Sequence, residues 1–125
     1  GGYLLSSHED VDITLIASGS EVRLTLAAAK TIQKNGSKVN VVSMPCLDKF
    51  YSQDKAYRNS VIDPNIPKLV IEALHPDSWQ GLINLNDCVI GMKTFGESAP
   101  ANDLMAKFGF TEDNIVTEAN KLLNR

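Results

Sequence analysis

Four short runs of β-branched and aliphatic residues constrain the fold more than any other feature of this sequence. They are Ile13 to Ala17, Val39 to Met44, Leu69 to Leu74 and Cys88 to Met92. Because nearly every position in them is apolar, each strand is expected to be buried on both faces, as in a parallel sheet covered by helices. Right-handed crossovers between such strands favour a three-layer α/β/α sandwich of about five strands.

The segment after the first run predicts a helix from Glu21 to Asn35. Its apolar residues recur with a helical period, and Gly36 supplies the left-handed residue expected just past a helix end. Ser20, or alternatively Ser18 paired with Glu21, is expected to cap the first turn.

Weaker patterns predict the remaining elements. Pro100 stands at a permitted first-turn position, and Thr111 is the expected cap of a last amphipathic helix. The expected elements are an edge strand at Tyr3 to Ser6, two short helical pieces within Asp48 to Ser60, a helix from Pro100 to about Lys107 and a helix from Glu112 to Leu123.

Size and charge exclude several classes of protein. The 125 residues suit one domain, residues 1–125, and the start at Gly1 instead of Met suggests a piece of a longer protein. The net charge of -3 and the lack of a block of like charge argue against nucleic acid as a partner. No apolar run approaches the roughly 18 residues of a membrane span, so no membrane is expected either.

The two cysteines, Cys46 and Cys88, lack the spacing of a metal pair or a redox motif. We expect them to be buried or half-buried free thiols. With no signal peptide and no disulfide framework, a cytoplasmic location is expected.

Several polar residues have both a functional and a structural interpretation. Gly19 and Ser20 form a strand-to-helix turn that could hold an anion, although the turn lacks a phosphate-binding glycine motif and Glu21 would repel a phosphate. Glu72 lies at the end of a buried strand. It could act as a general base or, more simply, be a structural carboxylate. The sequence places neither His8 nor His75 beside a cysteine or serine. A Cys-His or Ser-His nucleophile pair that forms only in the folded structure remains an alternative.

The segment Gly91 to Ala101 closes a predicted strand, makes a glycine-punctuated turn and opens a helix. Read with Ala17 to Val22 and Val42 to Pro45, it resembles the C-terminal domain of transketolase, and the likeness covers essentially the entire chain. The resemblance implies a three-layer α/β/α domain with a five-stranded mixed sheet. One strand of that sheet is antiparallel, which suits Tyr3 to Ser6.

The resemblance also implies a function for the longer protein. Transketolases transfer a two-carbon ketol unit between phosphorylated sugars of the pentose phosphate pathway, using thiamine diphosphate and a divalent metal (Mg or Ca). Their catalytic, cofactor and metal residues belong to two preceding domains, so none is carried over to this chain. The C-terminal domain packs on those N-terminal domains, contributes to a homodimer and is a possible regulatory ligand site. The alternative is an independent small α/β module that binds a nucleotide or an anion.

Three residues are candidates for contacts with other domains or with the second subunit: Phe95, Glu97 and Trp79. Phe95 lies between a strand end and a helix start, flanked by Gly91 and Gly96, a setting that projects a side chain from the carboxyl edge of the sheet. The alternative for Phe95 is a place in the core of its own domain.

Overall fold

The computed structural model describes residues 2–72, 79, 81–83, 87–91 and 110–124. Strands and helices alternate along most of the chain, as the apolar runs predict. The elements are β1 (Tyr3–Ser6), β2 (Ile13–Ala17), α1 (Glu21–Lys34), β3 (Val39–Ser43), α2 (Leu47–Ser52), α3 (Lys55–Val61), β4 (Lys68–Glu72), β5 (Cys88–Gly91) and α5 (Glu112–Leu122).

These five strands form one sheet in the order β1-β3-β2-β4-β5. β2 pairs with β3 and with β4, and β4 pairs with β5, all in the parallel sense. Leu15 at the centre of β2 lies opposite Val41 on one side and Leu69 on the other. β1 pairs with β3 in the antiparallel sense. The mixed sheet with a single antiparallel edge strand confirms the expected fold.

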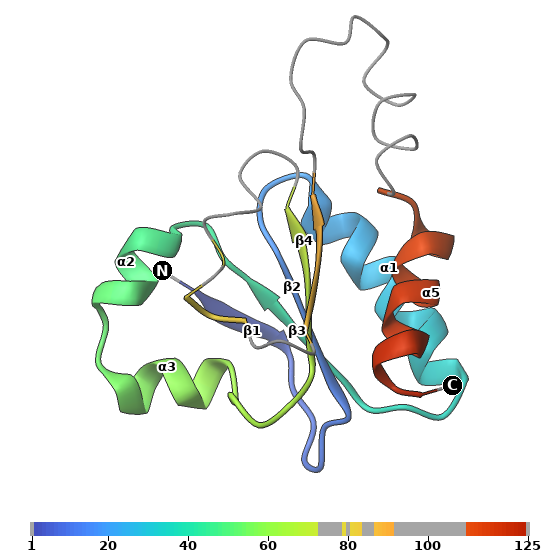
Figure 1. Cartoon of the computed structure of the whole chain (residues 1–125), viewed down its shortest axis with the longest axis horizontal. Coiled ribbons are helices and arrows are strands. Elements are labelled where there is room, and N and C mark those ends of the chain that lie inside the picture. Colours follow the sequence, from blue (N-terminus) through green and yellow to red (C-terminus); the bar gives the residue numbers. More distant parts are fainter. Residues whose placement is uncertain (1, 73–78, 80, 84–86, 92–109, 125) are drawn as a thin grey trace, which may run out of the picture.

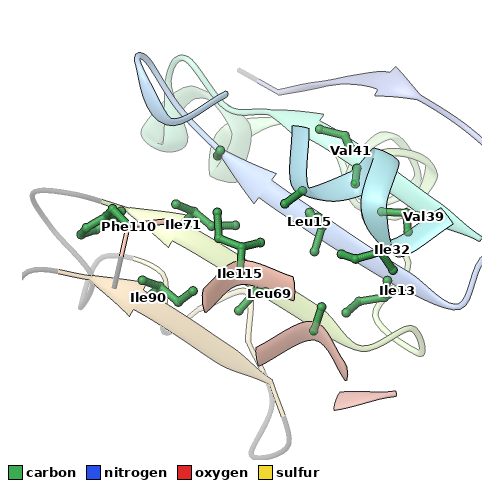
Figure 2. Close-up of a cluster of buried hydrophobic side chains, with 14 residues drawn as sticks. Ile13, Leu15, Ile32, Val39, Val41, Leu69, Ile71, Ile90, Phe110 and Ile115 are labelled. Carbon is green, nitrogen blue, oxygen red and sulfur yellow. The ribbon is translucent and has the colours of Figure 1, made fainter. Parts of the chain in front are cut away.

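Helices cover both faces of the sheet, so the fold has three layers (Figure 1). α1 and α5 lie together on one face, and α2 and α3 lie on the other. Successive side chains of a strand point to opposite faces, which divides the core in two. Leu15 belongs to the cluster under α1 and α5 (Figure 2), whereas Ile16 belongs to the cluster that includes Phe50 of α2.

The structure confirms one of the two expected helix caps and contradicts the other. The Thr111 side chain accepts a hydrogen bond from the Asn114 N–H and caps α5, as expected. The expected cap of α1 is wrong, because Ser20 has helical backbone angles and makes no side-chain capping bond. The carbonyl groups of Ser18 and Gly19 instead accept the first helical N–H groups, in a tight turn that Gly19 permits with a φ of 58°.

Two predicted features lie outside the described residues. The helix from Pro100 to about Lys107 is one of them. The turn that joins β5 to that helix is the other.

Candidate functional site

The carboxyl edge of the parallel strands is the first place to look for a site, since open α/β sheets bind ligands there. A cavity of about 260 Å³ opens at this edge, next to the ends of β2, β3 and β4. Ser18, Glu72, Asp48 and Cys46 supply its polar lining, and Trp79 belongs to the apolar part.

Ser18 and Glu72 connect two neighbouring strands at this cavity. The Ser18 hydroxyl donates a hydrogen bond to Glu72 Oε2 at 3.2 Å, which joins the residue after β2 to the last residue of β4. Glu72 is half-buried. This contact favours the structural interpretation of the carboxylate, because it holds the two strand ends together.

The turn at Gly19 and Ser20 carries its own negative charge. The Ser20 hydroxyl donates to Glu21 Oε1 at 3.1 Å, and Glu21 is only 7% exposed. Its Oε2 is also the atom nearest to the position that a Cβ on Gly19 would occupy, at 3.9 Å. A carboxylate at this place opposes a bound anion, and the anion site stays a prediction.

The two cysteines differ in exposure, and the expectation for Cys46 is wrong. Cys46 is exposed because it lies in extended backbone between Pro45 and the start of α2, outside both core clusters. Cys88 is half-buried, as expected, and its Sγ lies 3.7 Å from Glu118 Oε2. Burial, followed by the charge of Glu118, raises the pKa of the Cys88 thiol.

His8 is not brought to either cysteine. Its Nε2 lies 2.7 Å from Gln33 Oε1, and its backbone N–H donates to Asn40 Oδ1. The antiparallel direction of β1 places His8 at the amino edge of the sheet, away from Cys46, and the full width of the sheet separates β1 from β5 and Cys88. His75 lies outside the described residues.

Of the three interface candidates, only Trp79 is described. Its side chain is 2% exposed and packs in the cluster on the α2 and α3 face, and its contact with another domain or subunit stays a prediction. Phe95 and Glu97 lie outside the described residues.

A buried ion pair at the amino edge was not anticipated from the sequence. Lys68, at the start of β4, is fully buried, and its Nζ lies 3.2 Å from Asp87 Oδ2. The same ammonium group donates to the carbonyl oxygens of Ile66 and Pro64, at 3.0 and 3.3 Å. The sequence feature that could have indicated this pair is that Lys68 and Asp87 each directly precede an apolar strand run.

Within the described ranges, no group of three or more His, Cys, Asp or Glu side chains could hold a metal ion. The helices of this part of the chain are all too short or too polar to cross a membrane.

Comparisons with known proteins agree on one family. The model of the transketolase-like TK C-terminal domain matches residues 1–111. Transketolase 1 of Vibrio vulnificus strain YJ016 and a transketolase of Buchnera aphidicola are each 46% identical over 98% of the chain. The chain spans 19% of the length of either relative.

Solved structures agree with this result. A transketolase from Leishmania mexicana matches with a TM-score of 0.90 at 36% identity, covering 100% of this chain and 18% of that one. One from Campylobacter jejuni matches with a TM-score of 0.85 at 37% identity, again over 100% of this chain and 18% of the other. Sequence and fold therefore agree over the full length of the described domain, and the chain belongs to the family of transketolase C-terminal domains.

Proposed function

We propose that this chain serves as the C-terminal domain of a transketolase, with residues 1–125 forming one domain of a longer protein. The observation that carries the proposal is the 46% identity to transketolases over 98% of the chain. At that level of identity the whole domain is related, and the likeness is not limited to a fold that many unrelated proteins share.

The complete enzyme would transfer a two-carbon ketol unit between sugar phosphates of the pentose phosphate pathway. Related transketolases from Pichia stipitis have been solved with xylulose 5-phosphate and with sedoheptulose 7-phosphate, at 31% identity and a TM-score of 0.88 to this chain. We expect substrates of the same kind here.

Thiamine diphosphate, held with a divalent metal (Mg or Ca), would supply the nucleophilic carbon for this transfer. The described residues contain no group of acidic, histidine and cysteine side chains suited to the metal. On the family resemblance, we assign the cofactor to the preceding domains of the longer protein and no catalytic step to a residue of this chain.

The role we assign to this domain is packing on the N-terminal domains and assembly of a homodimer. Phe95 and Glu97 remain the candidate contacts of the turn after β5. The cavity between Ser18, Glu72 and Asp48 is the place where a regulatory ligand would fit. An exposed free thiol at Cys46 suits the reducing cytoplasm, where we place the enzyme.

Ketol transfer by the full-length protein tests the proposal. With thiamine diphosphate and Mg²⁺, the full-length protein should convert xylulose 5-phosphate and an aldose phosphate acceptor, and the 125-residue chain alone should not. Calorimetry with the isolated chain tests the alternative. Micromolar binding of a nucleotide, together with an inactive full-length protein, would favour the independent binding module.

Phe95→Ala tests the assignment of the turn. If Phe95 is an interface residue, the substitution should weaken the full-length dimer and leave the melting temperature of the isolated chain nearly unchanged. A loss of about 3 to 5 kcal/mol in the isolated chain would place Phe95 in the core of its own domain.

A further inference from the structure

Two large apolar side chains remain exposed in the part of the chain that the structure describes, and both belong to β1. Tyr3 is 51% exposed and Leu5 is 42% exposed. Both stand on β1, the edge strand of the sheet, and are together called the Tyr3 and Leu5 patch below.

The layer arrangement explains why Tyr3 is left uncovered. Leu4 packs into the cluster on the α2 and α3 face, so Tyr3 points to the opposite face, the one that carries α1 and α5. On that face α1 packs on β2, β3 and β4, and α5 packs on β5. Among the described elements, β1 is therefore not a strand on which α1 or α5 packs.

The shape of β1 suits a partner that packs on its side chains. Leu4 lies opposite Val42 and Ser6 lies opposite Val41, so Leu5 is the extra residue of a β-bulge. A bulge interrupts the hydrogen-bonding pattern of an edge and disfavours addition of another strand. The exposed apolar side chains are the feature of this edge that a partner can bury.

Gly2 fixes the place where the chain enters the domain. It is buried, its carbonyl accepts a hydrogen bond from the Tyr57 hydroxyl at 2.8 Å, and an added Cβ would lie 2.6 Å from Met44 Sδ. Whatever precedes Gly1 is thus tied to a fixed point next to Tyr3. Such a tether gives neighbouring surfaces a high effective concentration, so even a small patch can dock.

We propose that the Tyr3 and Leu5 patch is the docking surface for the part of the same polypeptide that precedes Gly1. The proposal rests on the proposed function, since it requires the longer protein, and it names the surface by which this domain packs on its neighbour. The chain spans 19% of the length of its curated relatives, and in a protein of that length the preceding chain would be long enough to cover the patch. An aromatic side chain beside a leucine is a suitable anchor for an apolar surface of that neighbour.

Hydroxyl-radical footprinting of the full-length protein, read by mass spectrometry, tests the patch. Tyr3 and Leu5 should be oxidised several times more slowly in the full-length protein than in the 125-residue chain, with buried Phe50 as the slow reference in both. Equal oxidation in the two proteins would overturn the proposal. Protection in the 125-residue chain together with a dimer by analytical ultracentrifugation would assign the patch to a second copy, which also overturns it.

A pair of variants gives an independent test in the full-length protein. Tyr3→Ser with Leu5→Ser should speed proteolytic cleavage next to Gly1 and leave the unfolding midpoint of the 125-residue chain nearly unchanged. Leu4→Ser is the matched control on the same strand and should lower the midpoint of both proteins. If the double variant is cleaved no faster than the wild type, the docking is refuted.

The ketol-transfer assay on the wild-type full-length protein separates the two claims. Activity with unprotected Tyr3 refutes the docking alone, and an inactive protein with protected Tyr3 refutes the transketolase assignment alone.

Discussion

The buried ion pair between Lys68 and Asp87 makes a strong prediction about stability. Asp87→Asn keeps a side-chain oxygen for the Lys68 N–H, which Asp87 Oδ1 now accepts at 2.9 Å, but removes the negative charge 3.2 Å from the ammonium group. The Lys68 side chain is 1% exposed and cannot turn to water. Breaking a buried pair in this way costs about 3 to 5 kcal/mol.

Two features of the site refine that magnitude. The carbonyl oxygens of Ile66 and Pro64 still accept from the ammonium group, so we expect a loss near the lower limit, about 3 kcal/mol. Lys68→Met combined with Asp87→Asn removes both charges at once. The double variant should therefore lose less stability than Asp87→Asn alone, since no unpaired charge stays buried.

Urea unfolding of the 125-residue chain, followed by far-UV circular dichroism, measures these differences. The exposed pair of Lys121 and Glu118 is the control, because Lys121 is 67% exposed and its replacement by Met should cost at most about 1 kcal/mol. A loss below about 1 kcal/mol for Asp87→Asn would show that water reaches Lys68. A double variant less stable than Asp87→Asn would equally contradict the argument.

Other predictions concern a helix cap and the thiols. Thr111→Ala should cost about 1 kcal/mol of unfolding free energy, because Thr111 caps α5, and urea unfolding of the variant and the wild type measures the loss. Cys46 should react with a thiol reagent well before Cys88 at neutral pH, because Cys46 is exposed and Cys88 is half-buried. Glu118→Gln should speed the reaction of Cys88, because it lowers the raised pKa of that thiol, and a pH-rate profile measures the change. Since that pKa is raised in the folded state, the contribution of Cys88 to stability is complete below the ordinary thiol pKa. It is lost as the pH rises through the folded value. Across that alkaline range, the urea midpoint of the wild type should therefore fall relative to the midpoint of Cys88→Ala.

Local patterns in the sequence were sufficient for most of the fold. The strand Ile13–Ala17 and the cap at Thr111 depend on residues within one turn or one strand, so periodicity and residue type predict them. The family resemblance added the antiparallel direction of Tyr3–Ser6, which the pairing with β3 confirms.

Contacts between distant segments were decided by the tertiary structure alone. Ser18 bonds Glu72, 54 positions away, so its hydroxyl is directed across the sheet and not to the helix it was expected to cap. Lys68 meets Asp87 because parallel pairing brings the starts of β4 and β5 together. The exposure of Tyr3 likewise depends on which strands α1 and α5 cover. No local sequence pattern around Tyr3 contains that information. Propensity acts over a few residues, whereas burial and pairing depend on the packing of the whole domain.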